Sequence, residues 1–123
     1  MTDYILVFAG GGLGSMARFL LSQYNATTLT ILPLGTIAAN IASSFILGLV
    51  VGLFSGGTDI PPSWRVFIAV GFCGGFSTFS TFSFETFYFI KTGQPLYALL
   101  NVVCNLMFCI MGVYAGFTLT APK

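Results

Sequence analysis

The sequence predicts an all-α membrane protein with four transmembrane helices. Its 123 residues are 56% hydrophobic and only 6% charged, whereas soluble domains carry about 25% charged residues. The chain therefore lacks the polar side chains that would cover a water-exposed surface. Because one span needs about 20 apolar residues, we place four spans in a single domain, residues 1–123, at about 3–24, 33–54, 63–90 and 96–118.

The first predicted span combines a glycine-rich run with a charge. Gly10 to Gly14 offers small residues, which let helix backbones approach closely in a membrane. Arg18 follows within the same helix, where a charge is unfavourable unless it reaches the interface, water or a partner. Two interpretations stay open for Arg18: a side chain that extends to the interface, or a vestibule cation that attracts an anion.

The second span carries a polar residue well inside its apolar sequence. It begins at Pro33, a position that a first helical turn tolerates, and Asn40 lies about two turns later. An asparagine at this depth either bonds a neighbouring helix or lines a pore as a donor. Gly48 and Gly52, four residues apart, provide a second face for close packing.

The third span is apolar at its ends but not in its middle. Gly74 and Gly75 precede a repeat of phenylalanines and hydroxyls over residues 76–83. We predict a helix break near Gly74–Thr78, because glycine is a weak helix former and the hydroxyls can bond freed backbone groups. Carbonyls released at membrane depth can also bind a cation.

The phenylalanines beyond the break are spaced by three residues, so they form a stripe that drifts slowly around the helix. Phe79 and Phe82 lie on it, with serines and threonines beside them. The alternative to a lined pathway is aromatic packing with hydroxyls bonded to the preceding turn. Glu85 follows within the same span and marks a functional site or an exit vestibule. In the fourth span, Asn101 and Asn105 share one face.

The positive charges are balanced across the membrane. Four spans place both termini and the second loop on one side, with Arg65 and Lys123, and leave Arg18 and Lys91 on the other. Because an imbalance of Lys and Arg normally sets orientation, we expect both orientations and an antiparallel, two-fold homodimer. A pore is expected between subunits, since one small bundle encloses little space.

Several classes of function are excluded by what the chain lacks. It has no histidine, and its cysteines (Cys73, Cys104 and Cys109) lie in apolar stretches without metal-ligand spacing. We find no nucleophile–base pair or phosphate loop, so the chain is not expected to be an enzyme, and its net charge of +1 gives no reason to expect nucleic acid. Hydroxyls, asparagine amides and aromatic ring edges instead form a consistent set of donors for a small anion.

Three segments resemble one known family. Gly-Phe-Cys-Gly-Gly-Phe-Ser-Thr-Phe-Ser-Thr-Phe-Ser, residues 71–83, is similar to the signature of the Fluc (CrcB) fluoride channels. Residues 11–18 and 33–40 resemble that family's first-helix and second-helix motifs. The resemblance implies a dual-topology, antiparallel homodimer with two pores, which passively exports fluoride from the cytoplasm through the cell inner membrane and contacts membrane lipid.

The resemblance also implies roles for individual residues. It assigns to the fluoride pore Asn40, Phe79, Ser80, Thr81 and Phe82, with Asn105, and more loosely Cys109, from the fourth helix. It assigns Arg18 and Glu85 to the vestibule. It further implies a structural Na⁺ at the dimer interface, held by the backbone carbonyls of Gly74 and Ser77. Ser77 replaces a common threonine, which matters little if only its carbonyl is used.

Two other functions compete with a fluoride channel. A dual-topology small-cation or multidrug exporter has a similar size, but it needs a deeply buried carboxylate in the first helix, where this chain has only Asp3 at the start. A non-transporting assembly subunit would show no flux in pure liposomes.

Overall fold

The computed structural model describes residues 1–25, 31–57 and 60–122, and within these ranges the secondary structure is helical, without strands. The long elements are α1 (Thr2–Asn25), α2 (Leu34–Ser55), an interrupted third span (Pro62–Lys91) and α6 (Pro95–Thr120). By length and composition, all four can cross a membrane. The prediction of an all-α chain with four spanning helices is therefore confirmed.

The third span consists of four segments. A short α-helical turn, α3 (Pro62–Arg65), leads into a π-helical stretch, η1 (Val66–Phe72), and then into α4 (Cys73–Phe76). The chain resumes as α5 (Phe79–Lys91) after two non-helical residues. Because π-helical turns occur mostly as short bulges, frequently at functional sites, a seven-residue π stretch before the interruption is a distinctive feature of this span.

Glycines set the distance between α1 and the first half of the third span. A Cβ on Gly10 would collide with the Phe67 carbonyl, and a Cβ on Gly14 with the Phe72 carbonyl. The predicted close approach of the first helix is thus observed, and its partner is η1. Backbones that approach this closely bury their contact without large side chains.

The pairing of α2 with α6 depends on the same principle. A Cβ on Gly48 would collide with the Val113 carbonyl, and a Cβ on Gly116 with the Phe45 carbonyl. The hydroxyl of Thr120 donates to the Leu49 carbonyl at 2.9 Å near the end of this contact. The close-packing face predicted at Gly48 and Gly52 therefore lies against α6.

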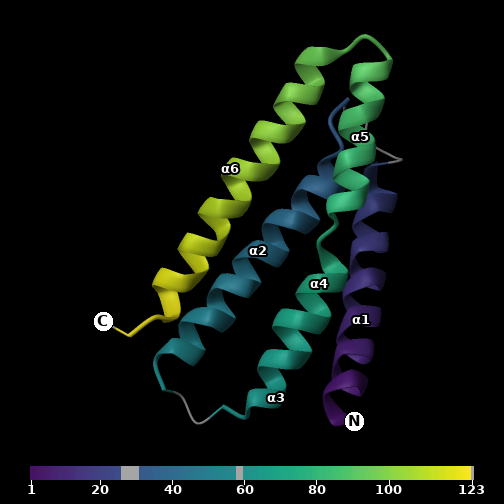
Figure 1. Cartoon of the computed structure of the whole chain (residues 1–123). Helices are drawn as coiled ribbons and strands as arrows, with labels where there is room; N and C mark the ends of the chain where they lie inside the picture. Colours follow the sequence, from purple (N-terminus) through teal and green to yellow (C-terminus); the bar gives the residue numbers. More distant parts are fainter. Residues whose placement is uncertain (26–30, 58–59, 123) are drawn as a thin grey trace.

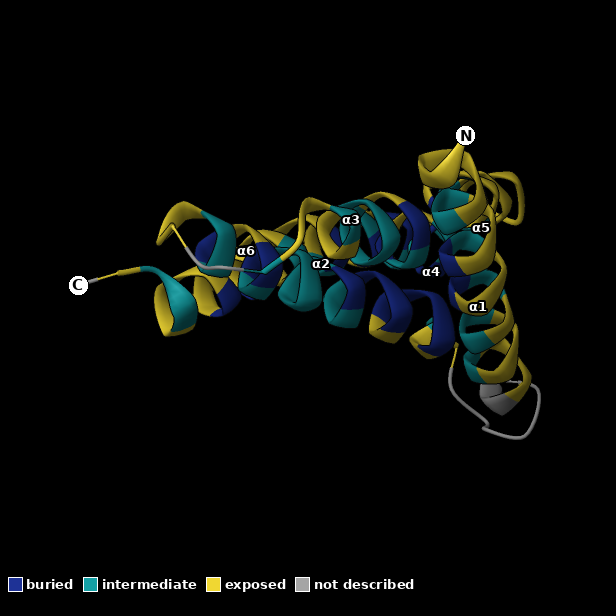
Figure 2. Cartoon of the chain, turned by 90° about the horizontal axis from the view of Figure 1, so that it is seen from below, coloured by how far each residue is buried: buried dark blue, intermediate teal, exposed yellow. Residues whose placement is uncertain are grey.

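The helices form a flattened bundle with both termini at one end (Figure 1). The α2–α3 connection lies at that end as well, and the α5–α6 connection lies at the opposite end. Buried residues gather where α2 and α4 meet their neighbours, whereas the outer faces of α1 and α6 are exposed (Figure 2). These faces carry large apolar side chains such as Phe8, Leu20 and Ile110, as contact with lipid or another subunit requires.

Candidate functional site

The third span is interrupted between α4 and α5, at Ser77 and Thr78. The backbone of Ser77 is extended (φ −76°, ψ 157°), and so is that of Thr78 (φ −150°, ψ 113°). Thr78 is the N-cap of α5, because its side-chain oxygen accepts a hydrogen bond from the Thr81 N–H at 3.2 Å. The break therefore lies inside the predicted window, at its C-terminal edge.

The glycine pair before the break is helical. Gly74 and Gly75 belong to α4, which runs to Phe76, so the helix continues through the weak helix formers that were the reason for predicting a break in this window. Gly75 instead allows α1 to approach, since a Cβ there would collide with the Gly11 carbonyl. A Cβ on Gly74 would meet open space, and this residue is exposed.

Two side chains of α2 bind the backbone around the break. Asn40 is 9% exposed, and its Oδ1 accepts a hydrogen bond from the Thr78 N–H at 2.8 Å. Ser43 donates to the Cys73 carbonyl at 2.9 Å. In a continuous helix the Thr78 N–H would bond the Gly74 carbonyl. Asn40 takes that N–H instead, and it thereby stabilises the interruption from a neighbouring helix.

A second asparagine connects Asn40 to α6. The Asn40 Nδ2 donates to Asn105 Oδ1 at 2.9 Å, and the Asn105 Nδ2 donates to Asn101 Oδ1 and to the Asn101 carbonyl, each at 3.0 Å. Asn105 is 4% exposed and Asn101 is completely buried. Asn40 therefore does link helices, as one of its two interpretations requires, and this does not exclude a place in a pathway.

A groove of about 270 Å³ lies beside the break, between α2, α5 and α6. It is lined by Asn40, Ser44, Ser77, Thr78, Phe79, Phe82, Asn105, Leu106, Cys109 and Ile110. The rings of Phe79 and Phe82 have centroids 5.4 Å apart, but Phe82 is 9% exposed and Phe79 is 77% exposed. Four predicted pore residues, Asn40, Phe79, Phe82 and Asn105, thus line one groove. Its Phe82 side is buried in the subunit, whereas its Phe79 side is exposed.

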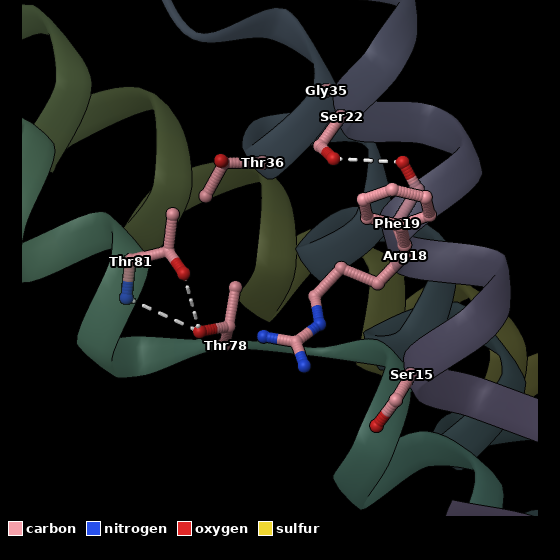
Figure 3. Close-up of a pocket in the computed structure, with 8 residues that line it drawn as sticks. All are labelled: Ser15, Arg18, Phe19, Ser22, Gly35, Thr36, Thr78 and Thr81. Carbon is pink, nitrogen blue, oxygen red and sulfur yellow. Dashed lines mark hydrogen bonds between the residues drawn. The ribbon is translucent and has the colours of Figure 1, made fainter. Parts of the chain in front are cut away.

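A second cavity, of about 290 Å³, also reaches the break. Its lining comprises Ser15, Arg18, Phe19, Ser22, Gly35, Thr36, Thr78 and Thr81. The Arg18 side chain extends from α1 into this cavity, toward Thr78 (Figure 3). Thr78 therefore lines both hollows, whereas Arg18 lines only this one and lies apart from the phenylalanine groove.

The hydroxyls at the start of α5 form a cluster. The Thr78 hydroxyl oxygen lies 3.2 Å from the Ser80 hydroxyl and donates to the Thr81 hydroxyl at 3.0 Å. Ser80 and Thr81 are both exposed, and neither lines the phenylalanine groove. Thr81 lines the cavity that holds Arg18. Within one subunit, then, these two predicted pore residues are separated from Phe79 and Phe82.

Glu85 lies one helical turn beyond the cluster. Its Oε1 accepts a hydrogen bond from the Thr36 hydroxyl at 2.6 Å, and Thr36 is 4% exposed. Its Oε2 is buried and has no hydrogen-bond partner among the described residues. A buried carboxylate oxygen without a donor is unfavourable, so Glu85 is a group that a proton, a water or a further donor would stabilise.

Comparison with known proteins decides the family. The family model described as "CrcB-like protein, Camphor Resistance (CrcB)" matches residues 5–117. The chain belongs to the CrcB family. This confirms the resemblance seen in its third-helix, first-helix and second-helix motifs, and the match extends over all four spans.

Curated relatives of this CrcB chain are similar along most of their length. A protein of Pyrococcus abyssi is 45% identical over 115 residues, which cover 94% of this chain and 93% of the relative. A protein of Escherichia coli is 48% identical over 103 residues, covering 84% and 81%. Both are named fluoride-specific ion channel FluC. As a member of this family of ion channels, the chain is a multi-pass membrane protein and not an enzyme.

Sequence reasoning missed two residues of the CrcB site, Thr36 and Ser43, and named two others, Thr78 and Asn101, without their partners. Thr36 and Ser43 of α2 bond Glu85 and the Cys73 carbonyl, Thr78 caps α5, and Asn101 holds Asn105. The shared face of Asn101 and Asn105 was predicted, and the structure adds the hydrogen bond between them. Thr36 and Ser43 had no usable signal, because a single hydroxyl in a membrane helix most often bonds its own preceding turn.

Proposed function

We propose that this protein is a passive, fluoride-selective channel that exports fluoride from the cytoplasm through the cell inner membrane. The observation that carries the proposal is the groove beside the helix break, where Asn40 and two phenylalanine rings come together. The names of the relatives supply the identity of the ion. The alternative of a multidrug exporter has no support in α1, where Asp3 lies exposed in the first turn.

The lining of the groove is suited to an anion that has lost part of its water. It contains amide and hydroxyl donors and aromatic rings, whose edges carry partial positive charge. No lysine or arginine lines it, so an anion would be held by dipoles and could leave again, as conduction requires. Arg18, in the second cavity, provides a cation near the pathway that concentrates anions.

A second copy of the chain would complete the pore. Phe79 leaves one side of the groove open and is 77% exposed. Ser80 and Thr81 are also exposed; their hydroxyls bond Thr78, and lipid can offer no partner to their remaining polar sites. An antiparallel homodimer would cover both features, and its two-fold symmetry would produce two equivalent pores. Each pathway would then be lined by Phe82 of one subunit and Phe79 of the other. Ser80 and Thr81 of one of the two subunits would face the same pathway.

The carbonyls assigned to a structural Na⁺ fit that ion. Asn40 takes the Thr78 N–H, which would otherwise bond the Gly74 carbonyl. The Thr78 side chain takes the Thr81 N–H, which would otherwise bond the Ser77 carbonyl. Gly74 and Ser77 thus keep neutral oxygen ligands for a hard cation, which would join two broken helices at the dimer interface. When bound, Na⁺ would hold these carbonyl dipoles together across the interface and would take no part in chemistry.

The decisive experiment is ion efflux from liposomes that contain the purified protein in sodium buffer. We expect fast fluoride loss, read with a fluoride electrode, and no chloride loss in matched liposomes. Equal loss of both anions would refute selectivity. A folded dimer that releases no fluoride would refute the channel, and cation uptake driven by a pH gradient would then test the exporter.

A further inference from the structure

A chain of hydrogen bonds leads from the helix break into α6. The backbone N–H of Thr78 donates to Asn40 Oδ1 at 2.8 Å. The Asn40 Nδ2 donates to Asn105 Oδ1 at 2.9 Å, and the Asn105 Nδ2 donates to Asn101 Oδ1 at 3.0 Å. Three side-chain amides on two helices are therefore aligned in one direction, with each nitrogen directed at the next oxygen.

The chain returns from Asn101 to the helix that carries the phenylalanines. The Asn101 Nδ2 donates to the Thr86 hydroxyl at 3.0 Å, and this hydroxyl donates to the Phe82 carbonyl at 2.8 Å. The two ends are backbone groups: the Thr78 N–H can only donate, and the Phe82 carbonyl can only accept. Because both ends have fixed polarity, the orientation of every amide between them is fixed as well.

This polarity determines which donor the groove can offer. Both N–H groups of Asn105 are used by Asn101, one on Oδ1 and one on the carbonyl. Asn40 donates one N–H to Asn105. The other contact of its nitrogen, to the Thr78 carbonyl, is long at 3.5 Å. Asn40 and Asn105 both line the groove, but only Asn40 retains an N–H that a stronger acceptor could take.

Asn101 itself cannot reach an ion in the groove. It is completely buried and is not part of the lining. Without its side chain, Asn105 would keep the backbone carbonyl of residue 101 as an acceptor but would lose Oδ1. One N–H of Asn105 would then have no acceptor, and its nitrogen could turn toward Asn40. Two donors would then face each other, so Asn40 would turn too, and the Thr78 N–H at the break would lose its acceptor.

We propose that Asn101 is a positioning residue, which acts through Asn105 to hold Asn40 with its amide nitrogen available as the groove's anion donor. This inference rests on the proposed fluoride function for its consequence. Its physical core, the coupling of Asn101 to Asn40 across Asn105, stands on the hydrogen bonds alone. Asn105 accordingly serves as a link in the chain, and does not donate to the ion.

The test combines a mutant cycle with a spectroscopic readout. Fluoride efflux is measured for Asn101→Leu, Asn105→Leu and the double variant. In the same dimers, the side-chain amide signal of Asn40 is followed by ¹H–¹⁵N NMR and assigned by its loss in Asn40→Asp. Thr118→Val is the control, because it removes an exposed hydroxyl of α6 that bonds only its own preceding turn.

Each single variant is expected to lower efflux about tenfold, the loss from one misplaced hydrogen bond, and the double variant should be no worse than Asn105→Leu. The Asn40 signal should move in Asn101→Leu and stay in Thr118→Val. The proposal is overturned if the losses of the two single variants multiply in the double variant, or if the Asn40 signal does not move in Asn101→Leu.

If Asn101→Leu does not fold, Thr86→Val breaks the same chain one bond further on, and its efflux and Asn40 signal decide in the same way. Absent wild-type efflux would refute the channel, while the NMR arm would still test the coupling.

Discussion

At the scale of single residues, the two phenylalanines of the groove have different environments despite their regular spacing. Phe82 is packed inside the subunit, whereas Phe79 points outward. The spacing predicted a shared stripe but could not show this asymmetry, because burial depends on what the neighbouring helices cover. Replacing each phenylalanine should therefore separate function from folding.

Phe79→Ile should lower fluoride efflux about tenfold, because a ring-edge contact contributes about 1 kcal/mol and isoleucine has none. Thermal unfolding in detergent should remain close to that of the wild type. Phe82→Ile should lower efflux and also destabilise the subunit by about 1–2 kcal/mol, since the buried site must repack. Wild-type efflux from either dimer would contradict the ring-edge argument.

Asn40→Asp should suppress efflux strongly. The substituted carboxylate places a negative charge on the proposed anion path. It also directs an oxygen at the Asn105 Oδ1, in place of the nitrogen that donates to it at 2.9 Å in the wild type. Efflux is compared with that of the wild type at equal amounts of dimer, checked by size-exclusion chromatography. Retained efflux from a well-folded dimer would assign Asn40 to helix packing alone.

At the scale of the elements, the sequence placed the break correctly but for an incomplete reason. Helix propensity pointed to the glycines, yet α4 includes both of them, and the helix ends where Asn40 captures a backbone N–H. That capture comes from a helix nearly forty residues away in the chain, so local patterns could not reveal it. The π-helical turns of η1 were equally invisible, because their residues are uniformly apolar.

The close packing of α1 provides a test at this scale. Gly14→Ala should destabilise the subunit by about 1–3 kcal/mol, because its Cβ would collide with the Phe72 carbonyl. Gly12→Ala on the same helix is the matched control: its Cβ meets nothing within 4 Å, and alanine favours helix by about 1 kcal/mol. Thermal unfolding in detergent should rank Gly14→Ala below the wild type and Gly12→Ala at or above it. The reverse order would show that α1 is not held by this contact.

At the scale of the whole molecule, the balance of positive charge predicts two orientations. Both termini and the α2–α3 connection lie at one end, as four spans require (Figure 1). Arg65 lies at that end and Lys91 at the other. The sequence could establish this balance because it needs only span count and charge. It could not establish the shape of the interface in the proposed dimer, which depends on the exposed faces of the folded subunit.

Adding positive charge at one end of the chain should abolish fluoride efflux, and co-expression with a chain that carries the charge at the other end should restore it. Thr92→Lys with Gln94→Lys adds charge near the α5–α6 connection, and Thr2→Lys with Gly56→Lys adds it at the opposite end. Each double variant alone should insert in one orientation and lose efflux, whereas co-expression of the two should restore it. Reporter fusions at the C-terminus measure the orientation. Full activity of either variant alone would contradict an antiparallel assembly.

The open side of the groove has a consequence for the life of the protein in a cell. If the channel is the proposed homodimer, a newly inserted subunit without a partner exposes Phe79 together with Ser80 and Thr81. Lipid is a poor environment for these polar side chains even though both bond Thr78, and incompletely folded or assembled states are the ones that proteases remove. Unpaired subunits should therefore be degraded quickly. Because pairing needs two subunits, a lower rate of synthesis should reduce the amount of assembled channel more than proportionally. The face that would complete the pore in a dimer would thus mark an unpaired subunit for degradation.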